Sequence, residues 1–179
     1  MLPRLEEQCI RMGYSFQSVG KSPLNSAGLK AVIAWTRLTQ GKDINADGLR
    51  LVLQFLSAGR LAQGARRSLV TLAESRPVTA GDLVEAGLAM TGALPIWHQA
   101  LDALPEEDKQ YFIAARKQGE TLTKKPRISI STIHGAKGGQ AQNVLVLTDM
   151  SSKTYANMER DPDSEHRTFY VAVTRTMQG

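Results

Sequence analysis

Residues 127–139 read RISISTIHGAKGG and carry the clearest indication of the fold. Residues 127–133 alternate polar and apolar side chains and are rich in β-branched residues, which predicts a β-strand. Residues 135–139 then contain three glycines, which predict a bend at the end of that strand. Open α/β sheets usually bind ligands at the carboxyl edge of their strands. The stretch therefore predicts an α/β fold with a candidate site at the bend, where His134 and Lys137 supply an imidazole and an ammonium group.

Two further elements are predicted after the bend. Residues 143–147 form a continuous apolar run, which is typical of a strand covered on both faces of a parallel sheet. Residues 164–177 have the spacing of an amphipathic helix. The side chains expected to face a core are Phe169, Tyr170, Val173 and Met177. The order strand, bend, strand, helix predicts part of a parallel sheet.

The start of the chain predicts the same class of structure. Residues 2–12 place apolar side chains at helical spacing, and Gly13 follows as a natural C-terminal stop. Residues 14–19 alternate enough to form a short strand, and residues 27–38 have the pattern of a second helix. This segment is therefore expected to form helix, strand and helix.

The middle of the chain has no convincing strand. Thr79 followed three residues later by Asp82 is typical of a helix N-cap with its reciprocal acid, and Pro105 suits a first helical turn. The predicted helices span residues 47–56, 61–74, 82–90, 94–104 and 106–118. We expect an all-helical insertion at 43–126 within a domain formed by residues 1–42 and 127–179.

The composition is that of an ordinary globular protein, with 179 residues of which 42% are hydrophobic and 22% are charged. No stretch approaches the roughly 20 apolar residues that cross a bilayer, and the first residues lack the apolar core of a signal peptide. The single cysteine, Cys9, excludes an intramolecular disulfide and argues against a zinc site, so we expect it to be a buried thiol. These features predict a soluble, cytoplasmic protein with no membrane partner and no metal site.

The net charge of +5 is compatible with a polyanionic partner. One group of cationic side chains lies within twelve residues and is opposed only by Glu120. Its members are Arg116, Lys117, Lys124, Lys125 and Arg127. Two interpretations remain open at this point: a solvated helix end with its linker, or a patch that contacts phosphates.

One short stretch imitates a phosphate-binding P-loop. Gly20, Lys21 and Ser22 match the end of that pattern, but Ser15 stands where the pattern requires a glycine. Pro23 is also a poor continuation into the required helix. We therefore interpret this stretch as a connecting turn and expect no site here that grips ATP phosphates.

The glycine-rich bend resembles motif V of the UvrD/Rep/PcrA-type superfamily 1 DNA helicases. The resemblance implies that Thr132 and His134 contact single-stranded DNA, and that Lys137 contacts a phosphate or maintains the loop. It also places Gly138 and Gln140 on the nucleotide-binding side. The family commonly has Glu at the position of Gln140, where it approaches the ATP ribose, and a neutral amide can still make that hydrogen bond.

A second stretch, RTFYVAVTR at residues 167–175, resembles motif VI of the same family. Arg175 matches the arginine finger, which stabilises charge in the transition state of phosphoryl transfer and is worth roughly 10³ to 10⁵ in turnover in other NTPases. His166 stands where the family usually has another Arg. Residues 14–20 and 29–38 resemble motif IVa more weakly.

The resemblance implies a second RecA-like domain, interrupted by the helical insertion. ATP and Mg²⁺ would be bound mainly by an N-terminal helicase domain of the same parent polypeptide, so we expect a fragment that does not hydrolyse ATP alone. The parent would translocate 3′ to 5′ on single-stranded DNA and unwind duplex DNA. Two alternatives remain: a helicase-nuclease subunit, and a non-catalytic module that contacts nucleic acid or protein through residues 116–127.

Overall fold

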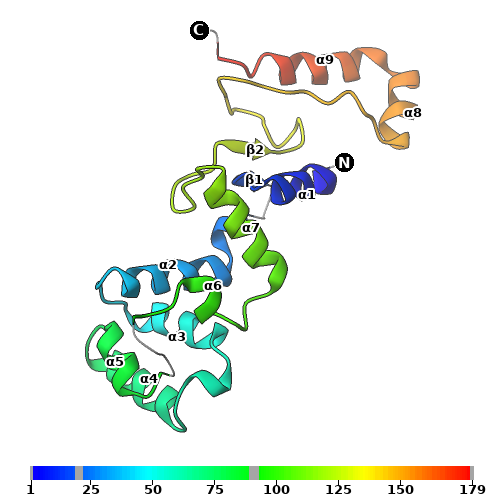
Figure 1. Ribbon diagram of the computed structural model, residues 1–179. Coiled ribbons are helices and arrows are strands. Elements are labelled where there is room, and N and C mark those ends of the chain that lie inside the picture. The colour runs from blue at the N-terminus through cyan, green and yellow to red at the C-terminus, as the bar shows by residue number, and fades with distance from the viewer. Residues whose placement is uncertain (1, 19–21, 89–92, 178–179) are drawn as a thin grey trace.

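A computed structural model describes residues 2–18, 22–88 and 93–177 of the chain (Figure 1). The molecule is elongated and has three successive parts. The helical body comprises residues 22–104 where they are described. The central part comprises residues 2–18 and 105–130, and the C-terminal arm comprises residues 131–177. In Figure 1 the body and the arm lie at opposite ends, with the central part between them.

The helical body contains most of the hydrophobic core. Trp35 and Leu49 are buried completely, and the indole N–H of Trp35 donates to the carbonyl oxygen of Pro95 at 2.8 Å. Its helices are α2 (Ala27–Thr39), α3 (Ala46–Phe55), α4 (Ala65–Ser75), α5 (Ala80–Glu85) and α6 (Trp97–Ala100), with 3₁₀ turns η1 (Pro23–Asn25) and η2 (Ala58–Arg60). Residues of α2 and α3 belong to the same hydrophobic core. This core therefore contains residues on both sides of the predicted domain boundary at residue 42. The proposed domain boundaries stay predictions.

The central part is a small α/β unit. Strands β1 (Phe16–Ser18) and β2 (Ile128–Ile130) pair in parallel, with Phe16 opposite Ile128 and Ser18 opposite Ile130. Helices α1 (Leu2–Met12) and α7 (Glu106–Lys117) contact each other, and α1 also contacts both strands. The predicted α/β class is therefore consistent with this unit, whose sheet has two strands among the described residues.

A buried carboxylate links the elements of the central part. Glu120, whose side chain is only 5% exposed, accepts hydrogen bonds from the Ser15 hydroxyl and, at 2.5 Å, from the Arg127 guanidinium. These two donors hold the pKa of Glu120 below its usual range. The Tyr111 hydroxyl donates to the carbonyl oxygen of Tyr14 at 3.2 Å, and burial raises the pKa of Tyr111 to about 12. The residue that precedes β1, the end of α7 and the residue before β2 are thereby tied together.

The C-terminal arm consists of an extended segment followed by two helices that contact each other. The helices are α8 (Ser152–Arg160) and α9 (Pro162–Val173). The Ser151 hydroxyl accepts from the Thr154 amide at the start of α8, and Asp161 accepts from the Ser164 amide at the start of α9. Helix α8 has no counterpart among the helices predicted from the sequence.

Several predicted helices of the body have different bounds in the structure. The capping box of Thr79 and Asp82 at the start of α5 is confirmed. Helix α4 begins at Ala65, four residues later than predicted, because Gly64 before it has φ +82° and interrupts the helix. Helix α5 ends at Glu85, and Gly87 at φ +84° closes it. The predicted helix at 94–104 is reduced to the single turn α6.

The predicted strand at 143–147 is wrong. This stretch has no strand assignment, and Leu145 is 86% exposed. A strand requires a neighbour that satisfies its backbone groups, and no described strand lies beside this one to do so. The apolar run therefore lies along the arm as extended chain.

The predicted core face of residues 164–177 is wrong at three of its four side chains, and the fourth, Phe169, is half-buried. Tyr170 is 69% exposed, Val173 is 55% exposed and Met177 is 46% exposed, whereas Ala172 is buried. The reason is that α9 contacts α8 but does not cover a sheet. Cys9 is likewise half-buried instead of enclosed, and this burial raises the pKa of its thiol.

Candidate functional site

The glycine-rich bend follows β2 as a chain of tight turns. The Thr132 hydroxyl oxygen accepts from the Gly135 amide at 3.1 Å. The Ala136 amide donates to the carbonyl oxygen of Thr132 at 3.0 Å, and the Lys137 amide donates to that of His134 at 3.3 Å. Gly138 adopts φ +82°, a left-handed conformation that favours glycine, although an added Cβ would meet no atom within 4 Å. The backbone conformation, and not space, is thus the reason for glycine at 138.

The side chains assigned to the bend are open to solvent. Thr132, His134, Lys137 and Gln140 are all exposed, as is Gly138. Thr132 uses its oxygen as an acceptor within the turn, which leaves its O–H able to donate to a ligand. The bend thus presents a hydroxyl, an imidazole and an ammonium group on one short loop.

The end of the bend is hydrogen-bonded to the residues after α9. The Ala141 amide donates to the carbonyl oxygen of Arg175 at 3.1 Å, and the Met177 amide donates to the carbonyl oxygen of Ala141 at 2.8 Å. These bonds form a parallel bridge between Ala141 and Thr176, which we call the 141–176 junction. The junction places Gln140 and Arg175 next to paired backbone, although they are 35 residues apart in the sequence.

Arg175 lies in the turn beyond α9, not on the helix as its pattern predicts. The helix ends at Val173 and Thr174 caps it, because the Thr174 amide donates to the carbonyl oxygen of Tyr170. The Nε of Arg175 donates to the carbonyl oxygen of Val171 at 2.9 Å. This bond fixes the orientation of the half-buried guanidinium and leaves its terminal N–H groups available as donors.

The residues that join the two motifs had no signal in the sequence. Ala141 bonds through its backbone to the backbone of Arg175 and Met177, so no side-chain type marks the junction. A bridge between a single pair of residues is also too short to produce a recognisable pattern of alternating residues in the sequence.

The exposed bend and the oriented guanidinium offer hydrogen-bond donors to an anionic ligand. Gly138 allows close approach of a phosphate to the backbone, the Gln140 amide can donate and accept, and Arg175 offers fixed donors. Within residues 2–18, 22–88 and 93–177, no three His, Cys, Asp or Glu side chains cluster as metal ligands. The P-loop imitation lies partly outside the described residues; Ser22 itself caps η1 by accepting from the Leu24 amide.

Comparison with known protein families supports the resemblance over the C-terminal segment. Residues 127–179 match the family model of the UvrD-like helicase C-terminal domain. This confirms the resemblance for those residues, which include both the bend and Arg175, and indicates a helicase-related function. No curated protein and no solved structure matched the chain. The match begins at residue 127, so the resemblance of earlier residues to motif IVa stays a prediction. None of the described helices is long and apolar enough to span a membrane.

Proposed function

We propose that this chain is part of an ATP-dependent DNA helicase that moves 3′ to 5′ along single-stranded DNA and unwinds duplex DNA. The observation that carries the proposal is the 141–176 junction, because it brings the glycine-rich bend and Arg175 to one place. The family match supports it, since the matched residues contain both elements. The parent protein would work in the cytoplasm, on the nucleoid.

The bend would contact the DNA strand. Lys137 would pair with a phosphate, and the Thr132 hydroxyl would donate to a phosphate oxygen. His134 can stack on a base or donate to the backbone. All three side chains are exposed, so binding would require no rearrangement of the core.

Arg175 and the end of the bend would face the nucleotide. Gly138 and Gln140 would approach the phosphates and the ribose, and Arg175 would place its positive charge near the transferred phosphoryl group. ATP supplies the free energy of movement, and Mg²⁺ neutralises charge on its phosphates. Both would be held mainly by an N-terminal helicase domain of the same polypeptide, so this chain alone is not expected to hydrolyse ATP.

The 141–176 junction would couple the two ligands. Ala141 is bonded through its amide to residue 175 and through its carbonyl to residue 177. A displacement of Arg175 toward a nucleotide would therefore move the end of the DNA-contacting bend. Domain closure around a nucleotide is a usual source of such displacements.

The DNA contact can be tested on the 179-residue chain. We expect the chain to bind fluorescent single-stranded DNA, with affinity that falls steeply as salt increases. Lys137→Ala should weaken binding and reduce the slope of log K against log salt by about 0.7, since one phosphate contact is lost. Lys42→Ala removes an exposed charge from the helical body and serves as the control. Equal losses in both variants would contradict the role of the bend.

The role of Arg175 can be tested in the parent protein. Arg175→Ala should lower DNA-stimulated ATP hydrolysis by about 10³ or more, as for other arginine fingers. The 179-residue chain should show no hydrolysis in the same assay. ATP hydrolysis by the isolated chain at helicase-like rates, retained in Arg175→Ala, would overturn this assignment.

A further inference from the structure

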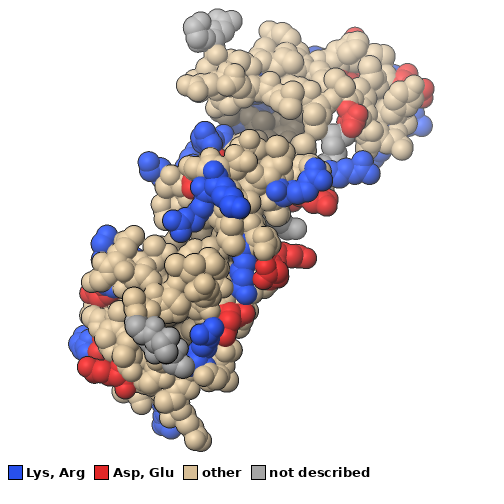
Figure 2. Space-filling model, viewed as in Figure 1, with Lys and Arg blue, Asp and Glu red and all other residues tan. Residues whose placement is uncertain are grey.

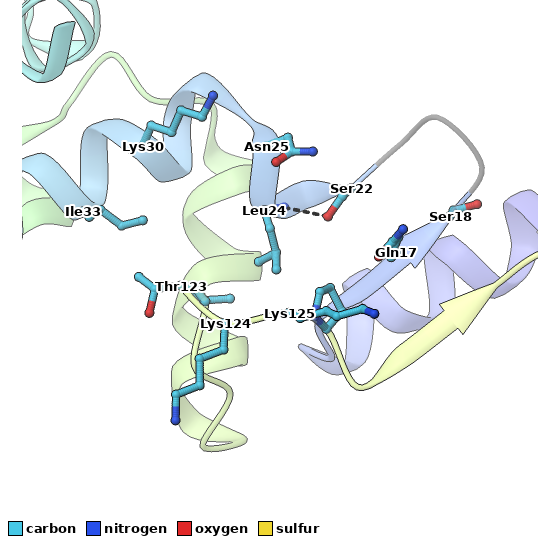
Figure 3. A pocket seen from close by; sticks show the side chains of 12 residues that line it. Gln17, Ser18, Ser22, Leu24, Asn25, Lys30, Ile33, Thr123, Lys124 and Lys125 are labelled. Carbon is cyan, nitrogen blue, oxygen red and sulfur yellow. Dashed lines mark hydrogen bonds between the residues drawn. The ribbon is translucent and has the colours of Figure 1, made fainter. Parts of the chain in front are cut away.

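A second cationic site lies away from the bend, between the helical body and the central part. A groove of about 670 Å³ separates the start of α2 from the linker at residues 122–126. We call it the lysine groove (Figure 3). It is lined by Gln17, Ser18, Ser22, Leu24, Asn25, Lys30, Ile33, Leu122, Thr123, Lys124, Lys125 and Pro126. Three lysines from two distant segments thus line one groove, and no carboxylate is among its described lining residues.

The charges at the lysine groove are not neutralised by the protein. Lys30, Lys124 and Lys125 are exposed, and none of them forms an ion pair with another described residue. The acid in the neighbouring sequence, Glu120, is buried and already bound to Arg127. Figure 2 shows that Lys and Arg side chains gather around the middle of the molecule. The linker is therefore an exposed cationic surface, and both interpretations that the sequence left open are compatible with it.

The arrangement of the lysines fits an extended anion better than a compact one. In Figure 3 the side chains of Lys30, Lys124 and Lys125 point in three different directions. Three ammonium groups on separate, exposed side chains are spread along the groove and are not gathered around one point. They can each contact a different phosphate of a polymer.

The rest of the lining indicates contact with a backbone instead of bases. Among the described residues that line the groove none is aromatic, so they offer no platform on which a base could stack. The neutral side chains Gln17, Asn25 and Thr123 can donate hydrogen bonds to phosphate or sugar oxygens. Such contacts position a strand without reading its sequence.

We propose that the lysine groove binds the phosphodiester backbone of the DNA strand as a second contact, separate from the bend. This inference rests on the proposed function, because it takes DNA as the ligand. The linker enters β2 and the bend leaves it, and a three-residue strand is about 10 Å long. One DNA strand can therefore contact both places at once. The groove would hold the strand near the bend and add to affinity without adding sequence preference.

The test compares two triple variants of the 179-residue chain that lose the same charge. Lys30→Gln, Lys124→Gln and Lys125→Gln together should reduce the slope of log K against log salt for oligothymidine by about 2, as three lost phosphate contacts require. Affinity at low salt should fall at least tenfold. Lys42→Gln, Arg50→Gln and Arg67→Gln, in the helical body, should leave the slope nearly unchanged. Circular dichroism should show the same thermal transition in all three proteins.

Three results would overturn the lysine groove. The first is an equal loss of slope in both triple variants, which would mean that only net charge matters. The second is an unchanged slope in the groove variant. The third is competition by tripolyphosphate as effective as competition by unlabelled oligothymidine at equal phosphate concentration, which would identify a compact anion as the ligand.

A variant of the bend separates this inference from the proposed function. His134→Ala with Lys137→Ala should lower affinity on its own, and its loss should multiply with that of the groove variant. Loss in the bend variant alone would leave the proposed function standing and remove the groove. Loss in the groove variant alone would keep the groove and remove the bend as the DNA contact.

Discussion

Gly13 shows how one residue can determine the packing of two helices. It ends α1 with φ +74°, and an added Cβ would lie 2.5 Å from the carbonyl carbon of Ala114 and 2.7 Å from the amide nitrogen of Ala115. Both atoms belong to the backbone of α7, which cannot move aside as a flexible side chain can. The glycine is therefore required by conformation and by space together.

Gly13→Ala should lower the free energy of unfolding by about 2 to 5 kcal/mol, since left-handed strain and overpacking add. Gly41→Ala is the matched control, because Gly41 has φ +72° but no atom within 4 Å of the added Cβ. The control should cost only about 1 to 2 kcal/mol. Urea unfolding followed by circular dichroism measures both. Equal costs would show that the contact with α7 does not matter.

Asp102 predicts a pH dependence of stability. It accepts from the Ser57 amide and hydroxyl, each at 2.8 Å, and from Arg60 Nε at 3.0 Å. Burial alone would raise the pKa of Asp102, but these donors lower it to about 2. Because the folded pKa lies below the unfolded value of about 3.9, the carboxylate stabilises the fold above about pH 4 and loses this effect as the pH falls toward 2.

Asp102→Asn should therefore destabilise the chain by about 1 to 2 kcal/mol at neutral pH, a value reduced for the partial exposure of the site. The difference from wild type should shrink as the pH falls from 4 to 2. Unfolding free energies at pH 7, 4, 3 and 2 provide the measurement. A difference that stays constant over this range would show that the ionised carboxylate is not the cause.

At the scale of elements, the sequence predicted those helix ends that depend on contacts between residues close together in the chain. The start of α5 follows from the hydrogen bonds between Thr79 and Asp82, three residues apart, and both are in the sequence pattern. Helix α7 begins at Glu106 with three acids in its first turn, as expected. The helix predicted at 94–104 was too long, and only the single turn α6 forms. Its apolar residues are buried against other helices, and such burial gives the same spacing of apolar residues as a longer helix. Local chemistry thus sets the starts of α5 and α7, whereas the length predicted around α6 depended on tertiary packing.

The central elements should depend on the buried carboxylate of Glu120. Glu120→Gln keeps the shape but removes the charge that pairs with Arg127 and accepts the Ser15 hydrogen bond, so it should cost about 1 to 3 kcal/mol. It should also speed hydrogen exchange of the amides that pair β1 with β2. Glu106→Gln is the control, since Glu106 is 70% exposed and its ion pair with Lys109 is worth at most about 1 kcal/mol. Unchanged exchange in β1 and β2 would show that Glu120 does not link these strands.

At the scale of the whole molecule, the glycine-rich bend was predictable from the sequence but its junction with the residues after α9 was not. The order of side chains from Thr132 to Gln140 identified the bend, because the chemistry is contiguous in the sequence. The 141–176 junction depends on backbone groups, and the lysine groove depends on Lys30 from a distant helix. A sequence pattern shows neither which backbone groups pair across the fold nor which distant side chains come together. The strand expected at 143–147 failed for the same reason, since a strand is defined by its neighbour.

The exposed apolar run at 143–147 should make the chain self-associate. Leu145 is 86% exposed and Leu147 is 37% exposed, and unpaired apolar chain of this kind is a common site of intermolecular pairing. Leu145→Lys should lower the apparent mass in sedimentation velocity runs at increasing concentration, because it places a charge on the associating surface. Its thermal transition should stay within about 1 °C of wild type, since an exposed side chain contributes little to stability.

Ile96→Lys gives the matched control for this last experiment. Ile96 is 53% exposed but lies on the helical body, far along the chain from the arm. Association that falls in Leu145→Lys and persists in Ile96→Lys would locate the contact on the arm. Equal effects would mean that the fall in association comes from the net charge of the molecule, since an added lysine at either position increases repulsion between copies. The comparison also bears on the proposed helicase, because a segment that pairs between copies is one that a neighbouring domain of the parent protein could cover.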